Sequence, residues 1–220
     1  MMTEVKIEKL QKLDQETLER LIEIYMNAYE GMREYGGEGE SYAKRYLRWC
    51  WSKAKDGFFV AKIDDEIVGF IVCDDDWYSK YEGKTVGAIH EFVVDRRYQG
   101  HGIGHRLMER CLEYLKGKKI ELWVGEKNER AKRFYKEYGF REVGKHGIWV
   151  RMVRPAEKVI KVEGRGVGSG RHALRSTPES GEGEGNERGE LHKGRKGKAE
   201  GHDRGERDPR NYDERKAEER

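Results

Sequence analysis

DRRYQGHGIGHRLMERCLEYL, residues 95–115, places three glycines at alternating positions directly before a run of helical character. Just upstream, VGAIHEFVV (residues 86–94) has the β-branched and aromatic composition of a buried strand. The order is therefore strand, glycine turn, helix. Because the first turn of a helix has unpaired backbone N–H groups and the positive end of the helix dipole, this order predicts an anion site.

The three glycines suit close approach of a phosphate to the backbone. Gly100, Gly102 and Gly104 lack Cβ atoms, so we expect them to take positive φ and to let their amides converge on phosphate oxygens. A P-loop is excluded, because its last glycine precedes Lys and then Ser or Thr, whereas His105 follows Gly104 here. A Rossmann fingerprint is excluded too, because no third glycine stands at the required spacing. On these residues alone, a tight turn without a ligand stays open.

A second stretch, LWVGEKNERAKRFYKEYGF (residues 122–140), predicts a strand, a loop with Asn128 as N-cap, and a helix ending near Gly139. QGHGIG (residues 99–104), taken with Asn128, Tyr135 and the Gly139–Phe140 pair, closely resembles the GNAT superfamily of acetyl-CoA-dependent N-acetyltransferases. QGHGIG matches that family's pattern of Gln or Arg, two residues, Gly, one residue, then Gly or Ala. In the family this segment cradles the pyrophosphate of coenzyme A.

The resemblance covers roughly residues 4–154. It implies an α/β, three-layer GNAT-like fold with a mixed, largely antiparallel sheet, splayed central strands and flanking helices. One departure is Gly125, which stands where many relatives carry a larger apolar residue beside the acyl pocket. The expected elements are a strand at 4–10, a helix after Asp14, a helix at 41–55, strands at 57–64, 66–74 and 86–94, the helix after the glycine turn, a strand at 120–125 with its helix, and two closing strands.

Three segments are expected along the chain. Residues 1–154 form the GNAT domain, 155–163 a short extension, and 164–220 a charged, glycine-rich tail. The tail has almost no aliphatic residues and no periodicity, so it is predicted to be disordered.

The resemblance also implies where the coenzyme binds. The pantetheine arm would lie between the splayed strands and pair with the strand backbone, while the pyrophosphate would contact the glycine turn. The binding residues implied in this way are Phe92, Val93, Val94, Gln99, Gly100, His101, Gly102, Ile103, Gly104, His105, Asn128 and Tyr135.

For the chemistry, the resemblance implies that Tyr135 is the general acid near the coenzyme sulfur, with aromatic packing as the alternative. His90 is the first choice of general base and Glu91 the second, because an imidazole titrates near neutral pH and some relatives carry a base on this strand. A water chain is a third route. Strand alternation places Ala88 and His90 on one face and Glu91 on the other, unless a bulge intervenes.

The acceptor is expected to be an amine. The stretch CDDDWYSKYEGK (residues 73–84) suggests carboxylates that attract a cation and aromatic rings that line its stem, with a solvated hairpin turn as the alternative. The residues considered are Tyr29, Tyr35, Asp74, Asp75, Asp76, Trp77 and Tyr78. The sequence leaves open whether the acceptor is a protein N-terminus, a lysine, or a small amine or polyamine.

Composition limits the other classes of function. The net charge is +3 with both signs interspersed, so nucleic acid is an unlikely partner, although HKGRKGK (residues 192–198) carries a short basic cluster. Three scattered cysteines argue against a disulfide framework or a zinc site, and Cys111 is expected in the core. Without a signal peptide or a membrane-spanning run, a cytoplasmic location and no membrane partner are expected.

We therefore expect an acyltransferase that moves an acetyl group from acetyl-CoA, its cosubstrate, to a primary amine. The amine attacks directly in a ternary complex, and no metal is required. The alternative is a non-catalytic acyl-CoA-binding sensor, or an interaction protein that acts through its tail. A homodimer stays open.

Overall fold

A computed structural model describes residues 4–36 and 39–156 of the 220-residue chain. Only residues 155 and 156 of the predicted extension fall within this range, and the predicted tail at 164–220 lies outside it. The three predicted segments therefore remain predictions at their C-terminal boundaries.

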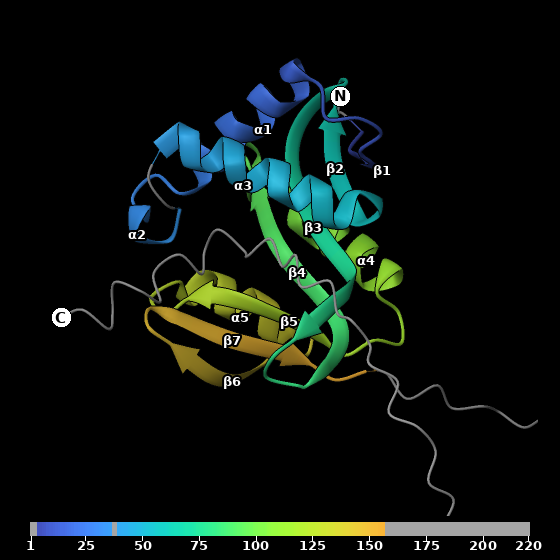
Figure 1. The fold of residues 1–220 in the computed structure, drawn as a ribbon. Coiled ribbons are helices and arrows are strands. Elements are labelled where there is room, and N and C mark those ends of the chain that lie inside the picture. The colour runs from blue at the N-terminus through green and yellow to red at the C-terminus, as the bar shows by residue number, and fades with distance from the viewer. Residues whose placement is uncertain (1–3, 37–38, 157–220) are drawn as a thin grey trace, which may run out of the picture. The chain divides into compact units, whose positions relative to one another are not determined.

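The core of the fold is a seven-stranded sheet in the order β1-β2-β3-β4-β5-β7-β6 (Figure 1). β4 and β5 run parallel, and every other neighbouring pair is antiparallel. This confirms the predicted mixed, largely antiparallel sheet. The strands are β1 (Lys6–Lys9), β2 (Phe58–Ile63), β3 (Glu66–Ser79), β4 (Lys84–Val94), β5 (Ile120–Gly125), β6 (Arg141–His146) and β7 (Trp149–Arg154).

Helices cover both faces of the sheet, which confirms the predicted three layers (Figure 1). α1 and α3 pack on one face, and α4 and α5 pack on the other. The helices are α1 (Gln15–Ala28), α2 (Arg33–Gly36), α3 (Gly39–Ala54), α4 (Ile103–Tyr114) and α5 (Glu129–Glu137), with 3-10 turns η1 (Lys55–Gly57) and η2 (Arg96–Tyr98).

Local capping explains where two of the helices begin. The Asp14 side chain accepts a hydrogen bond from the Thr17 backbone N–H at 3.0 Å and starts α1. Asn128 does the same for α5 by accepting from the Ala131 N–H at 3.1 Å, as the sequence predicts. At the other end of α5, Gly139 has a φ of +82°, a value typical of the glycine that follows a helix.

β3 is longer than its sequence suggests. The acidic stretch after Cys73 continues the strand to Ser79, with a register shift of one residue between Asp74 and Trp77. The reading of this stretch as a solvated turn is therefore wrong for Asp74, which is buried, and for Trp77, which pairs with Val86 on β4. The three consecutive aspartates at 74–76 suggest a turn in the sequence, although the first of them, Asp74, is buried within the strand.

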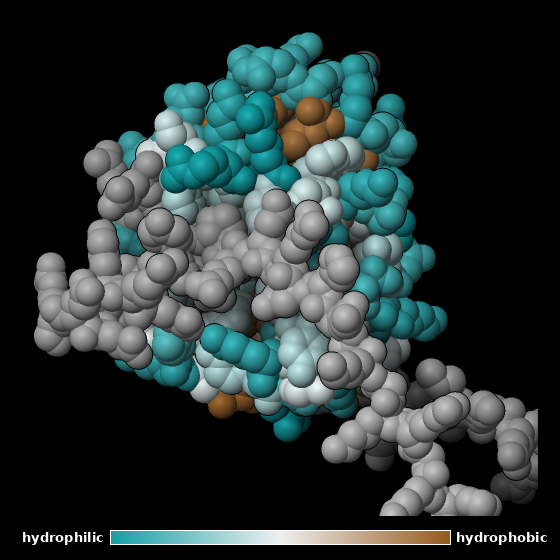
Figure 2. Space-filling view, viewed as in Figure 1, coloured by the Kyte–Doolittle hydropathy of each residue, from teal (hydrophilic) through white to brown (hydrophobic). Residues whose placement is uncertain are grey.

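The buried residues form one cluster on each face of the sheet. Cys50 lies in the α1–α3 cluster, whereas Cys73 and Cys111 lie in the α4–α5 cluster, and all three are buried. The expectation that Cys111 belongs to the core is confirmed. Burial raises the pKa of the Cys73 thiol well above its ordinary value. The described surface seen in Figure 2 is mostly hydrophilic with small hydrophobic patches.

Candidate active site

The glycine turn between β4 and α4 has the backbone geometry of an anion site. Gly100 and Gly102 have φ values of +84° and +76°, which residues with side chains rarely adopt. Gly102 is also the N-cap of α4, and among the described residues no side chain caps that helix end. An added Cβ would meet nothing within 4 Å at either glycine, so packing of the protein itself does not demand glycine there. This open turn and the bare helix start fit a phosphate group.

Gly104 differs from the expectation of positive φ. It is the second residue of α4 and has a helical conformation, because the left-handed turn is already complete at Gly102. A Cβ added at Gly104 would lie 3.4 Å from Cζ of Phe92. That distance is an ordinary van der Waals contact, so a small side chain would also fit between α4 and β4.

The other predicted turn residues are linked to their surroundings by hydrogen bonds. Gln99 Nε2 donates to the Val94 carbonyl at 3.0 Å, and its Oε1 accepts from Arg130 Nη1 at 2.8 Å. His105 Nδ1 lies 2.8 Å from Tyr138 Oη. These contacts connect the turn to β4 on one side and to α5 on the other. His101 Nδ1 lies 3.0 Å from the Gln99 carbonyl within the turn itself.

β4 and β5 separate beside this turn, as the splayed-strand prediction requires. Their pairing ends at Ile89 and Leu122, beyond which β4 pairs only with β3 and β5 only with β7. Phe92, Val93 and Val94 lie past this last pair, on the part of β4 that leads into the glycine turn. Their backbone therefore borders the fork between the two strands, where the resemblance places pantetheine (Figure 1).

A β-bulge at His90 changes which side chains of β4 share a face. Val72 lies opposite Glu91, and the next residue of β3, Cys73, lies opposite Ile89, so His90 is the extra residue. Ile89 packs in the α4–α5 cluster. His90 instead contacts Trp49 of α3, and Glu91 contacts Tyr29, the C-cap residue of α1. The alternation that would put Glu91 on the opposite face from His90 therefore does not hold.

His90 is held on all sides at the start of the fork. Its Nε2 lies 2.9 Å from Asp74 Oδ2, and its carbonyl accepts a 2.6 Å hydrogen bond from Tyr46 Oη. The rings of Trp49 and Trp77 meet the imidazole edge-on, at centroid distances of 4.9 and 5.0 Å. The indole N–H of Trp49 is buried without a hydrogen-bond partner among the described residues. This side of the fork is therefore a polar site with aromatic walls.

Glu91 reaches the same site from the next position. Its Oε1 accepts hydrogen bonds from Tyr29 Oη at 3.1 Å and from the Phe92 backbone N–H at 3.0 Å. Glu91 is buried. The Phe92 N–H predicted to pair with pantetheine is thus bonded to this carboxylate, and the assignment of Phe92 to coenzyme binding remains a prediction.

Tyr135 lies on the α4–α5 side of the fork. It is 8% exposed, and its ring packs against Phe92 and Phe140 at centroid distances of 6.4 and 5.8 Å. The structure therefore brings Tyr135 to the strand that carries His90, but from the other face of the sheet. Asn128 serves as the N-cap that sets the start of the Tyr135 helix, and any contact with coenzyme remains a prediction.

Glu121 on β5 forms a buried network that the sequence did not reveal. It lies opposite Ala88 of β4 and reaches past that small residue to Trp77 Nε1 at 2.9 Å and Ser79 Oγ at 2.7 Å on β3. Arg151 Nε and Nη2 donate to its Oε2 at 2.9 and 2.6 Å. This network braces the strands at the closed end of the fork. Its partners are far apart in sequence, so no local signal identifies them.

Tyr35 explains the departure at Gly125. A Cβ added to Gly125 would lie 2.6 Å from the Tyr35 ring, which also packs edge-on against Trp149 at 5.3 Å. Tyr35 Oη accepts from the Lys127 backbone N–H at 3.1 Å. The aromatic side chain from α2 therefore fills the space that a larger residue at Gly125 would occupy.

The acidic stretch of β3 contributes one carboxylate, that of Asp74, to the site. Burial raises the pKa of Asp74, but hydrogen bonds from His90 and from the Asp76 backbone N–H outweigh it, so the pKa lies below its ordinary value. Asp75 is exposed and accepts from Tyr114 Oη on α4 at 3.3 Å. Tyr78 is 64% exposed. Of the proposed acceptor residues in this stretch, only Asp74 and Trp77 join His90.

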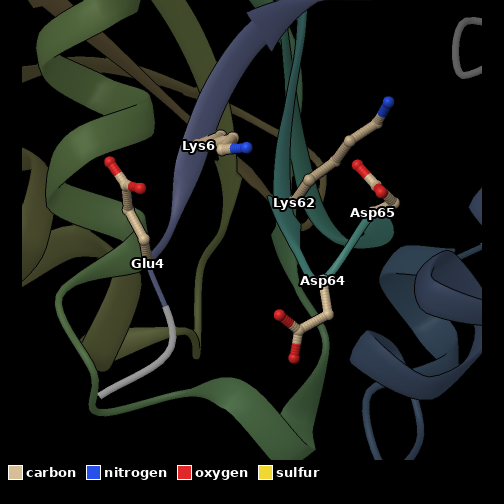
Figure 3. A pocket seen from close by; sticks show the side chains of 5 residues that line it. All are labelled: Glu4, Lys6, Lys62, Asp64 and Asp65. Carbon is tan, nitrogen blue, oxygen red and sulfur yellow. The ribbon is translucent and has the colours of Figure 1, made fainter. Parts of the chain in front are cut away.

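A cavity of about 250 Å³ lies elsewhere, at the edge of the sheet. Figure 3 shows its polar lining from β1, β2 and the following turn. None of its lining residues belongs to the candidate site. The lining residues are Glu4, Lys6, Lys62, Asp64 and Asp65.

Two further features of the described residues bear on the expectations. Residues 4–36 and 39–156 contain no group of three or more His, Cys, Asp or Glu side chains arranged to hold a metal ion. None of the helices in that same part of the chain is long and apolar enough to span a membrane.

Several known proteins resemble this chain. An uncharacterized N-acetyltransferase of Archaeoglobus fulgidus is 42% identical over 130 residues, which cover 58% of this chain and 88% of the relative. Another, from Methanocaldococcus jannaschii, is 37% identical over 153 residues, or 68% of each chain. The crystal structure of PH1933 from Pyrococcus horikoshii OT3 is 60% identical, has a TM-score of 0.65, and matches over 70% of this chain and 99% of its own.

Residues 18–140 match the acetyltransferase (GNAT) family. The matched segment contains β4, the glycine turn, α4, the fork and α5. Together with the N-acetyltransferase relatives, this match confirms the predicted family and its class of enzyme, the acyltransferases. The chain belongs to the acetyltransferase (GNAT) family.

Proposed function

We propose that the protein transfers the acetyl group of acetyl-CoA to a primary amine by direct attack within a ternary complex. The observation that carries this proposal is the placement of two unlike sites on one strand. Beyond Ile89, where its pairing with β5 ends, β4 carries the buried His90 and Glu91 and then leads into a turn with two left-handed glycines. A proposed proton-transfer site and a proposed anion site are thus joined by a short segment of β4 that no longer pairs with β5.

On the binding side, the turn from Gln99 to His105 receives the pyrophosphate of the cosubstrate. The uncapped start of α4 and the left-handed turn at Gly100 and Gly102 support this assignment. The backbone of Val93 and Val94 borders the fork and pairs with pantetheine. A backbone N–H near Val93 polarises the thioester carbonyl, which stabilises the oxyanion that develops during acyl transfer.

On the side of β4 that carries the buried polar residues, the nitrogen of the acceptor amine attacks the thioester carbon, and His90 takes a proton from that amine. Glu91 is the alternative base, because its carboxylate lies on the same face. The carbon–sulfur bond then breaks, and Tyr135 donates a proton to the departing thiolate. The geometry supports this separation of the acid from the base. Tyr135 packs against Phe92 on one face of β4, and the His90 side chain packs against Trp49 on the other.

The acceptor is a primary amine of a protein N-terminus, a lysine or a small molecule. The aromatic walls formed by Trp49 and Trp77 and the nearby carboxylate of Glu91 support a cationic amine as the species that arrives. We also propose a cytoplasmic location, on the sequence grounds given above.

A thiol-release assay with acetyl-CoA and a panel of peptides, lysine derivatives and polyamines tests the proposal. We expect release that depends on the acceptor, with at least one acceptor well above the rate of hydrolysis. Tight coenzyme binding without turnover on any acceptor would contradict catalysis and favour the acyl-CoA-binding sensor. Absence of coenzyme binding would refute both.

A further inference from the structure

Asp74 and His90 form a buried pair between β3 and β4. Asp74 Oδ2 lies 2.9 Å from His90 Nε2, and both side chains are less than one-tenth exposed. The other carboxylate oxygen, Oδ1, accepts from the Asp76 backbone N–H at 2.9 Å. That second bond fixes the plane of the carboxylate and directs Oδ2 at the imidazole.

The imidazole is as constrained as the carboxylate. The bulge places His90 outside the regular ladder, and Tyr46 Oη binds its carbonyl at 2.6 Å. The rings of Trp49 and Trp77 stand at 73° and 82° to the imidazole plane and restrict its rotation. The ring therefore keeps Nε2, and not Nδ1, toward Asp74.

The protonation of this pair follows from the chemistry of its two atoms. An ionised carboxylate only accepts hydrogen bonds, so the Nε2 that faces it must carry a proton. A neutral imidazole has one N–H, and its lone pair then belongs to Nδ1. The pairing thus selects one of the two tautomers of His90.

We propose that Asp74 is a positioning residue, which keeps a proton on Nε2 of His90 so that Nδ1 accepts the proton of the attacking amine. This inference rests on the proposed function of His90 as the base. In the step, an N–H bond of the amine breaks and an N–H bond forms at Nδ1, while the amine keeps its electron pair for the new carbon–nitrogen bond. Asp74 stays ionised and stabilises the imidazolium.

Other charged and titratable groups surround the Asp74–His90 pair. Glu91 is its neighbour on β4, Lys53 of α3 acts on Asp74, and Glu121 of β5 is paired with Arg151 and contacts Trp77. Tyr29, the C-cap residue of α1, donates a hydrogen bond to Glu91. All of these groups are retained in Asp74→Asn, so the variant differs from the wild type in the Asp74 carboxylate alone.

The test combines ring-nitrogen NMR of the full, ¹⁵N-histidine-labelled chain with the pH dependence of kcat/KM. The His90 resonance is assigned by its loss in His90→Gln. In the wild type we expect the proton of the neutral ring on Nε2. Because a carboxylate favours the charged imidazolium, Asp74→Asn is expected to move the acid limb of kcat/KM to lower pH by about one unit or more. The plateau should fall at least about tenfold.

Two variants serve as controls. Asp74→Glu keeps the charge and should return the acid limb toward its wild-type position. Asp65→Asn removes the same charge in the exposed turn before β3 and should leave both the tautomer and the limb unchanged. A merely structural role for Asp74 would lower the rate at every pH without moving the limb, and melting curves of each variant show whether it is folded.

Three results would overturn the inference. The first is a wild-type His90 with its proton on Nδ1. The second is an acid limb that disappears in His90→Gln but stays in place in Asp74→Asn, which refutes only the role of Asp74. The third is an acid limb that survives in His90→Gln, which refutes the proposed base as well.

Discussion

β4 has one face against α4 and α5 and another against α1 and α3, and the two faces present different chemical groups. The first is apolar at Ile89 and Phe92 and leads to the glycine turn, where backbone amides are proposed to bind the pyrophosphate. The second holds buried polar side chains, His90 and Glu91, with partners from β3 and α1. Backbone geometry suits a constant group such as pyrophosphate, whereas side chains suit proton transfer and choice of acceptor. Substitutions on one face at a time test whether coenzyme binding and proton transfer are separate.

The largest effect is expected from the hydroxyl of Tyr135. Tyr135→Phe keeps the ring that packs against Phe92 and Phe140 but removes the proton for the thiolate. Turnover should fall by about 100-fold, at the low end for general acid catalysis, and the alkaline limb of the pH profile should change. Coenzyme affinity should not change. Rates are measured by thiol release from acetyl-CoA.

Tyr114→Phe is the control for this variant, since it removes a hydroxyl of α4 that bonds only Asp75 among the contacts described. It should turn over like the wild type. If Tyr135→Phe stays within about threefold of wild type across the pH range, far less than the ~100-fold expected of an acid catalyst, then Tyr135 is a packing residue and another group protonates the thiolate.

The next effect concerns the turn. Gly102→Val should weaken coenzyme A binding by at least about tenfold, or about 1.4 kcal/mol, because the side chain resists positive φ and blocks the phosphate. Gly117→Val is a matched control, since Gly117 also has positive φ (+80°) and open space around its Cβ, in the loop before β5. Equilibrium dialysis with coenzyme A should separate the two. Equal losses would mean that strain, and not the lost phosphate site, causes the effect.

The smallest effect is on stability. Asp95, buried just before the turn, binds Arg97 Nη2 at 2.7 Å and Arg20 Nη2 at 3.0 Å. The Arg97 hydrogen bond lowers the pKa of Asp95 from 3.8 to about 2. After allowance for the exposure of Arg97, Asp95→Asn should cost about 1 kcal/mol of unfolding free energy at pH 7.

The pH dependence of that loss follows from its sign. A carboxyl with a lower pKa in the folded state stabilises the protein above its unfolded pKa. The contribution is lost as pH falls from 3.8 through about 2. Denaturant melts of both proteins across this range should therefore converge in acid. A constant difference down to pH 2 would assign the effect to packing.

The face of β4 that leads to the glycine turn could be predicted from sequence, because the residues that determine the turn are close together in the chain. Gly100 and Gly102 are two residues apart, and positive φ favours glycine wherever it occurs. Asn128 and Gly139 likewise mark both ends of α5 through contacts within a few residues. The prediction of positive φ for Gly104 is wrong, because the spacing of the glycines does not show where the turn ends and the helix begins.

On the face of β4 that carries His90 and Glu91, the sequence could predict only a set of candidate catalytic residues. The bulge at His90 depends on the register of β3 against β4, and one residue of register decides which face Glu91 occupies. The partner of His90, Asp74, belongs to an acidic run that is typical of a turn. Tyr35 and Gly125 meet across 90 residues of sequence. Such contacts need the tertiary structure.

The most direct test of the separation between the two faces is calorimetric titration of acetyl-CoA into three proteins under the same conditions: wild type, Gly102→Val and His90→Gln. We expect His90→Gln to bind like the wild type while its turnover falls, and Gly102→Val to bind at least about tenfold more weakly. A His90→Gln protein that loses as much affinity as Gly102→Val, or a folded Gly102→Val protein with wild-type affinity, would contradict the account.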